Sequence, residues 1–149
     1  MRTEKPDKLH FTAFEIFMKS GLTIPSLMTH VPAGNRKDIE PQLERIDLNL
    51  MLTGGSSTYL LLHVEGDSMD GVVSDGDWVV LSREKEPISG DIVVARLNGE
   101  YTIKKHQLRL GHKRGLFLVP TNGKYQPTQI QEGDDYEILG VVAYIIKKP

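Results

Sequence analysis

From residue 59 onward, short apolar runs alternate with polar segments that favour turns. The runs are rich in Val, Ile, Leu and Tyr, and they have the length and composition of strands. Asn98-Gly99 lies between two of them and is a strong signal for a two-residue hairpin. The sequence therefore predicts a mainly antiparallel β body with strands at Tyr59–Val64, Trp78–Leu81, Asp91–Leu97, Tyr101–Leu110, Leu116–Val119 and Tyr136–Ile146.

The first 44 residues show no sustained apolar period. The segment 32–38 is small and polar and is typical of a loop. We predict an N-terminal arm over residues 1–44 and a β domain over residues 45–149. Within the arm, helical spacing extends over only a short stretch, carried by Phe11, Phe14, Phe17 and Met18.

The beginning of the predicted β domain, residues 46–52, is ambiguous. Its leucines alternate as they do in a half-buried strand. Asp47 before the segment and Gly54 after it suit the two ends of a short helix instead.

Composition narrows the class of protein. The chain has 149 residues and a formal net charge of −2, without the basic balance of an autonomous nucleic-acid binder. It contains no cysteine, which excludes a thiol nucleophile, a thiolate zinc site and a disulfide framework. No apolar run approaches the roughly 18 residues that span a bilayer, and the charged first eight residues are unlike a signal peptide. We therefore expect a cytoplasmic protein without a membrane segment.

A serine follows the first predicted strand, in the segment Gly66–Gly71. A serine between a strand end and a helical turn is well placed to be exposed, and backbone N–H groups at such a turn can stabilise an oxyanion. The plain alternative is that this segment is only a turn. A nucleophile elbow is excluded because Asp70 stands where that motif needs glycine. An S-x-x-K match at Ser82–Lys85 lacks the motifs that accompany it in serine enzymes.

A nucleophilic serine needs a base, and none of the five histidines has a recognisable triad context. Lys104 and Lys105 lie in a predicted strand, so their side chains face opposite ways. A lysine on a half-buried face loses hydration, which lowers its pKa and yields a neutral amine able to take the serine proton. A drop in pKa from about 10.4 to about 7 corresponds to roughly 4.6 kcal/mol. The alternative is an edge strand that carries lysines against aggregation.

Four sequence blocks occur in an order that resembles the LexA/UmuD peptidase family. They are Glu65–Met69, Ser74–Asp77, Gly90–Ala95 and Gly99–Lys105, and Leu118–Asn122 and Leu139–Val142 also fit. The resemblance implies a LexA/signal-peptidase-like curved antiparallel β domain. It further implies that Ser68 is the nucleophile, Lys104 the general base and Lys105 a structural residue. The backbone N–H groups of Ser68 and Met69 would form the oxyanion hole.

The same resemblance implies a self-cleavage site and a set of partners. Family members cut themselves at a Cys-Gly or Ala-Gly bond, and Ala33-Gly34 is the one Ala-Gly dipeptide in this chain. The short arm favours the UmuD type, because it leaves too little room for a helix-turn-helix domain ahead of the cut. The implied partners are a second copy of the chain, a RecA–single-strand DNA filament as coactivator and a Y-family, UmuC-like polymerase. Neither a cofactor nor a metal is expected, and direct DNA binding is not expected.

Three other classes of function stay open at this point. A non-cleaving interaction or regulatory module of the same fold would leave the serine unused. A signal-peptidase-like enzyme also uses a serine before methionine and a distant lysine, but it needs a membrane anchor. A remnant of a phage-type repressor would bind DNA, against the acidic balance of the chain. The cluster Asp67, Asp70, Asp75 and Asp77 suggests a cation site only weakly, since its spacing does not match a calcium loop.

Overall fold

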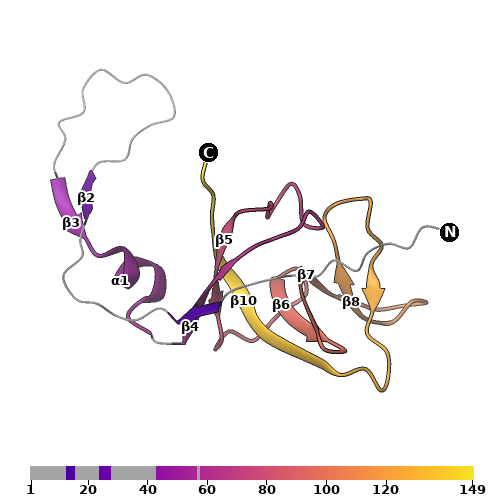
Figure 1. Ribbon diagram of the computed structural model, residues 1–149. Coiled ribbons are helices and arrows are strands. Elements are labelled where there is room, and N and C mark those ends of the chain that lie inside the picture. Colours follow the sequence, from indigo (N-terminus) through magenta and orange to yellow (C-terminus); the bar gives the residue numbers. More distant parts are fainter. Residues whose placement is uncertain (1–12, 16–23, 28–42, 57) are drawn as a thin grey trace. The chain divides into compact units, whose positions relative to one another are not determined.

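The computed structural model describes residues 13–15, 24–27, 43–56 and 58–149 (Figure 1). The chain divides into two compact units. The smaller unit is Ile16–Ser57, and the larger one combines Met1–Glu15 with Thr58–Pro149. Of the arm predicted over residues 1–44, only residues 13–15, 24–27 and 43–44 are among the described residues.

The described residues of the smaller unit form a pair of short strands and one helix. Strands β2 (Ile24–Leu27) and β3 (Leu43–Ile46) pair antiparallel. Helix α1 (Leu48–Thr53) begins after Asp47, whose side chain accepts hydrogen bonds from the N–H groups of Asn49 and Leu50 at 2.9 and 3.2 Å. It ends at Gly54, which adopts a left-handed conformation with φ 60°. The two end signals thus prevail over the alternating leucines. Within the described residues, no helix is long and apolar enough to cross a membrane.

The larger unit is an eight-stranded antiparallel sheet, which confirms the predicted mainly β class. The strand order is β1-β4-β5-β10-β6-β7-β8-β9. All six predicted strands are present, with ends shifted by at most one residue. The elements are β1 (Ala13–Glu15), β4 (Tyr59–His63), β5 (Trp78–Ser82), β6 (Ile92–Leu97), β7 (Glu100–Arg109), β8 (Gly115–Val119), β9 (Thr128–Gln129) and β10 (Tyr136–Ile146).

The sequence pattern did not predict the two outer strands of the sheet. The apolar spacing between Phe11 and Met18 indicates a helix, and this is wrong for Ala13–Glu15. These residues form β1, which pairs with the edge of β4 and places Phe14 opposite Leu61. The two-residue strand β9 pairs in the same way with β8. Such short strands depend on hydrogen bonds from a distant edge, and no local period encodes those bonds.

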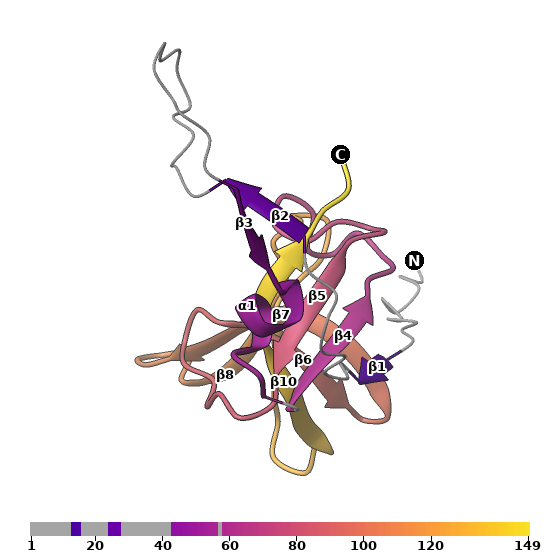
Figure 2. The same cartoon turned by 90° about the vertical axis from the view of Figure 1, so that its left-hand side faces the viewer.

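Strand β10 lies between β5 and β6 and joins the two halves of the sheet (Figures 1 and 2). Its first half pairs with β6 and its second half with β5. The register shifts between Ile138 and Gly140 and again between Val142 and Tyr144. An extra residue at each shift bends the strand, and the bend allows one strand to serve both neighbours.

The predicted hairpin between β6 and β7 is confirmed. Asn98 and Gly99 form its two-residue loop, and both have positive φ, at 50° and 83°. A two-residue turn of this kind matches the twist of the flanking strands and requires a left-handed conformation at both positions. The hairpin sets the register that places Lys104 opposite Val93.

Two clusters of buried residues form the core. The larger cluster draws alternate residues from β4 and β5 and also includes Met69 and Ile103; the smaller one lies where β6, β8 and β10 meet. Val93 and Val94 are neighbours in β6 but belong to different clusters, so this strand is buried on both faces. The clusters comprise Leu60, Leu62, Val64, Met69, Val73, Val79, Leu81, Val94 and Ile103, and Val93, Ala95, Leu118 and Val141.

Asp77 is a buried carboxylate, and its contacts predict that the fold loses stability at low pH. It accepts hydrogen bonds from the Ser74 N–H at 2.8 Å and from the Lys147 ammonium. Burial alone raises the pKa of Asp77, but these hydrogen bonds and the charge of Lys147 outweigh burial and hold that pKa below its ordinary value. A depressed pKa contributes stability that is present above the unfolded value of about 3.9 and is lost as pH falls through the folded value.

We therefore expect the Tm to drop as pH is lowered from about 4 to 2. Asp77→Asn should flatten that drop, because the amide has no proton to gain. Thermal melts followed by circular dichroism between pH 7 and pH 2 measure both slopes. Parallel curves for the wild type and the variant would contradict the assignment.

Candidate active site

Ser68 lies on a tight turn that follows β4. The turn is closed by hydrogen bonds from Asp70 N–H to Asp67 O at 3.1 Å and from Val73 N–H to Met69 O at 2.9 Å. Met69 and Val73 are buried in the larger core cluster and fix the turn to the sheet. The expected exposure of the serine is wrong: Ser68 is only 2% exposed, since it lies against the core beside Met69 and contacts a buried lysine.

Lys104 comes from the middle of β7, on the face opposite to that of Ile103. Its Nζ lies 2.7 Å from Ser68 Oγ, although 36 residues separate the two. The lysine is 9% exposed, so its amino group is largely withdrawn from water. The structure therefore brings together the two side chains that the sequence selected as nucleophile and base.

Two further oxygens surround the Lys104 amino group. Thr102 Oγ1 lies 2.8 Å from Nζ and Ile103 O lies 3.1 Å from it. A neutral amine has two N–H donors and one lone pair, and it can donate to these oxygens while accepting from the Ser68 hydroxyl. An ammonium can instead donate to all three. The same geometry therefore serves both protonation states, and loss of the proton breaks none of these three contacts.

The backbone donors predicted for the oxyanion hole sit on the same turn. Within residues 43–56 and 58–149, neither the Ser68 N–H nor the Met69 N–H donates a hydrogen bond to another group. No described residue competes for these two donors, as an oxyanion hole requires. The predicted cleavage site, Ala33-Gly34, lies outside the described residues.

The S-x-x-K match does not form a comparable pair. Lys85 Nζ lies 2.9 Å from Asp91 Oδ1, and the Lys85 side chain is 49% exposed. Ser82 Oγ accepts a hydrogen bond from the Lys85 backbone N–H at 3.2 Å. An exposed ammonium paired with a carboxylate is a poor base, so this motif is a structural turn.

Three of the four carboxylates in the acidic cluster hold neighbouring groups by hydrogen bonds. Asp75 accepts a hydrogen bond from the Gly66 N–H at 2.8 Å, and Asp67 accepts one from the Tyr125 hydroxyl. Asp77 is bonded to Ser74 and Lys147, as described above. In the part of the chain that the structure describes, no group of three or more side chains is arranged to hold a metal ion.

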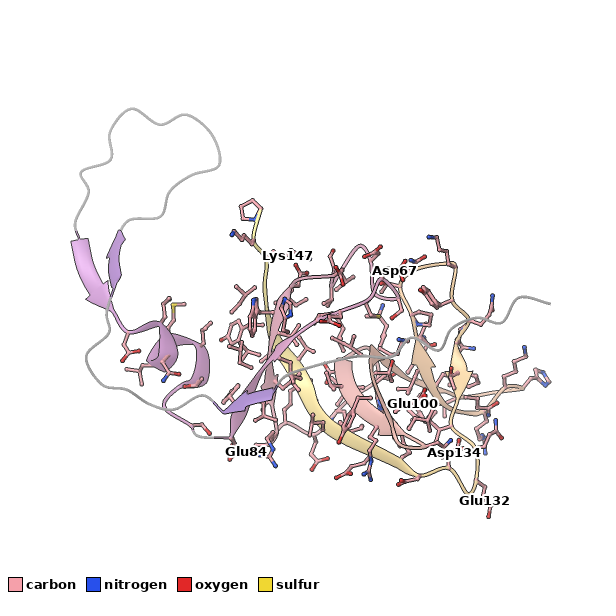
Figure 3. All side chains as sticks on the ribbon, viewed as in Figure 1. Asp67, Glu84, Glu100, Glu132, Asp134 and Lys147 are labelled. Atoms are coloured by element: carbon pink, nitrogen blue, oxygen red, sulfur yellow. The ribbon has the colours of Figure 1, made fainter. Side chains whose placement is uncertain are left out.

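Sequence reasoning missed three residues near the contact between Ser68 and Lys104. Thr102 lies on the same strand face as Lys104, and its position two residues earlier is the signal that could have found it. Asn122 and Tyr125 come from the loop between β8 and β9 and contact the serine turn at Asp67. Figure 3 shows Asp67 on the loop after β4, beside the loop that follows β8. No local pattern marks these two residues as neighbours of Ser68.

The sequence matches the model of a known protein family. Residues 26–143 match the profile of the family described as Peptidase S24-like. The LexA repressor of Acidothermus cellulolyticus is 40% identical over 95 residues, which cover 63% of this chain and 32% of that protein. The LexA repressors of Streptomyces clavuligerus and Mycobacterium leprae are 40% and 39% identical over 95 residues, covering 63% of this chain and 37% and 38% of their own lengths. The chain thus spans about a third of the length of these relatives.

Proposed function

This chain belongs to the Peptidase S24-like family, and from that premise we propose that it is a serine endopeptidase that cuts its own chain with a Ser68–Lys104 dyad. The observation that supports this most is the 2.7 Å contact between Lys104 Nζ and Ser68 Oγ inside a buried site. A hydroxyl and an amine at that distance are within reach of direct proton transfer. Burial disfavours a charged amine, which favours the neutral form that a base requires.

In the proposed reaction, Ala33-Gly34 is the scissile bond. Neutral Lys104 takes the proton of the Ser68 hydroxyl as Oγ attacks the Ala33 carbonyl carbon. The N–H groups of Ser68 and Met69 stabilise the oxyanion of the tetrahedral intermediate. Lys104 then gives its proton to the Gly34 amine as the Ala33–Gly34 bond breaks. Water, deprotonated by Lys104, attacks the acyl-enzyme, and Lys104 returns that proton to Ser68 Oγ as the Ala33 carboxylate leaves.

Tethering makes a slow catalyst sufficient. The scissile bond is part of the same chain or of a bound copy, so its effective concentration is high. Each chain needs to be cut only once. The rate is then set by how often residues 33 and 34 reach Ser68 and by the fraction of Lys104 that is neutral.

The test is the intact mass of the purified protein after incubation across a pH series from neutral to strongly alkaline. We expect fragments 1–33 and 34–149 to appear without any coactivator. Their rate of appearance should rise about tenfold per pH unit while most of Lys104 is still protonated, because only the neutral amine is a base. A chain that stays whole at every pH, and also with a RecA–single-strand DNA filament, would favour the non-cleaving interaction module instead.

The proposed physiological role is that of a UmuD-like protein of the SOS response. In this proposal the chain is a cytoplasmic homodimer, a RecA–single-strand DNA filament stimulates cleavage, and the product 34–149 joins a Y-family, UmuC-like polymerase in error-prone translesion synthesis. The support is the order of the blocks around Ser68 and Lys104 and their likeness to the LexA/UmuD family. The names of the relatives favour a second candidate, the peptidase part of a LexA-type repressor.

The two roles differ in what the protein binds. Size-exclusion chromatography of fragment 34–149 with a purified UmuC-like polymerase tests the first role, and a co-eluting complex absent with the uncut chain is expected. Tight, salt-dependent binding of the whole protein to duplex DNA, without a polymerase complex, would favour the repressor.

A further inference from the structure

A planar trans peptide links the direction of its N–H to that of its C=O. The two groups point opposite ways, so a hydrogen bond that fixes the carbonyl also fixes the N–H. The Ser68 N–H belongs to the peptide that carries Asp67 O. The Met69 N–H belongs to the peptide that carries Ser68 O. Whatever holds these two carbonyls therefore aims the two donors of the predicted oxyanion hole.

One residue binds both carbonyls. Asn122 Nδ2 donates to Asp67 O at 2.9 Å, and the Asn122 backbone N–H donates to Ser68 O at 3.0 Å. Asn122 lies 55 residues after Asp67, in the loop that connects β8 to β9. The side chain and the main chain of this one residue thus hold two consecutive peptides of the serine turn.

Neighbouring contacts hold the same loop against the same turn. Thr121 Oγ1 donates to Asp70 O at 3.0 Å, and the Tyr125 hydroxyl donates to Asp67 Oδ1. Asn122 Oδ1 accepts from the Lys124 N–H at 3.1 Å, which fixes the direction of the side-chain amide. The Thr121 bond is of a different kind, because the peptide that carries Asp70 O presents the Gly71 N–H, which is not a donor of the predicted hole.

We propose that Asn122 is a positioning residue that orients the oxyanion hole through the carbonyls of Asp67 and Ser68. This assignment rests on the proposed self-cleavage. Asn122 touches neither the Lys104 amine nor the Ser68 hydroxyl in any described contact, so it acts on the stabilisation of the intermediate and not on the base. An oxyanion hole works only when its donors are held in place before charge develops.

The chain supplies matched variants for the test. Asn122→Leu removes the Nδ2 donor with little change in side-chain shape and no change in charge. Asn122→Asp keeps the side-chain shape and the acceptor for the Lys124 N–H but lacks the Nδ2 donor. It provides a second test of the donor if Asn122→Leu does not fold. Thr121→Val is the control, since it removes the hydrogen bond to Asp70 O and the weak one to Met69 Sδ between the same loop and the same turn, while Asp67 O and Ser68 O keep their bonds to Asn122.

The measurement is the first-order rate of self-cleavage as a function of pH, with the Tm of each variant recorded alongside. For Asn122→Leu we expect the alkaline plateau to fall about 10- to 100-fold. This is less than the loss of a whole oxyanion donor, because the Asn122 N–H still binds Ser68 O and the Asp70 N–H still binds Asp67 O. Its pH midpoint should stay that of the wild type. Asn122→Asp should show a similar loss of plateau, and Thr121→Val should stay within about threefold of the wild type.

Three results would overturn the assignment. The first is a wild-type plateau in both Asn122 variants. The second is an equal loss in Thr121→Val, which would make the loop a general support of the turn. The third is a midpoint that moves with the rate in Asn122→Leu, which would mean that the serine–lysine contact itself was disturbed. If the wild-type chain itself does not cleave, the proposed function is overturned, and this assignment is overturned with it. If the wild type cleaves, the three results above test the role of Asn122 alone.

Discussion

Ser68→Ala is expected to lower the rate of self-cleavage at least about 10⁴-fold, because alanine has no oxygen to form the acyl-enzyme. Lys104→Met should lower it by a similar factor, since methionine fills a comparable volume but cannot accept the serine proton. The two changes together should cost about as much as either one alone, as expected for residues that act as a unit. The rates are read from intact mass at alkaline pH, where the wild type is fastest.

The chain offers a matched pair of controls for these variants. Ser82 and Lys85 have the same side chains in the same protein, but Lys85 is paired with Asp91 and Ser82 accepts from a backbone N–H. Ser82→Ala and Lys85→Met should therefore cleave within about threefold of the wild type. Continued cleavage at Ala33-Gly34 in Ser68→Ala would remove the dyad from the mechanism, whatever the family does elsewhere.

Gly140→Ala is expected to lower the free energy of unfolding by about 3 kcal/mol. Gly140 lies in β10 at the first register shift, opposite Val94. A Cβ at this position would lie 2.8 Å from Ser82 O and 3.2 Å from Leu81 Cβ. The closer atom belongs to the backbone of β5, so relief requires two paired strands to move apart rather than one side chain to rotate.

Urea unfolding followed by circular dichroism measures this loss. Gly123→Ala is the control, since no heavy atom lies within 4 Å of the Cβ that it would add. It should change the free energy of unfolding by less than about 0.5 kcal/mol. Equal stabilities for the two variants would show that β5 and β10 adjust to the added methyl group without cost.

The strands and turns of the β body could be predicted because their signals are local. The apolar runs bounded by turn residues gave all six predicted strands, and Asn98-Gly99 gave the hairpin between β6 and β7. Asp47 and Gly54 correctly indicated the ends of α1. In each case the deciding interaction joins residues only a few positions apart, so a short stretch of sequence is enough to predict it.

The outer strands and the burial of the site could not be predicted in this way. β1 and β9 exist because distant strand edges offer hydrogen bonds to them. Ser68 appeared exposed when judged from its turn, but it is buried because the turn folds onto the core through Met69. These outcomes depend on which segments meet in space, and neither propensity nor period carries that information.

By itself the sequence determined which residue types are available for chemistry and on which elements they lie. The resemblance of its sequence blocks to a known family indicated Ser68 and Lys104, and strand alternation predicted that Lys104 and Lys105 face opposite ways. Only the tertiary structure decided that Nζ and Oγ are 2.7 Å apart, that Thr102 and Ile103 complete the surroundings of the amine, and that Asn122 holds the serine turn. The physical reason is that strand pairing across the sheet brings residues from β7 and from the loops after β4 and β8 together, and the hydrogen bonds among them form only once it has done so.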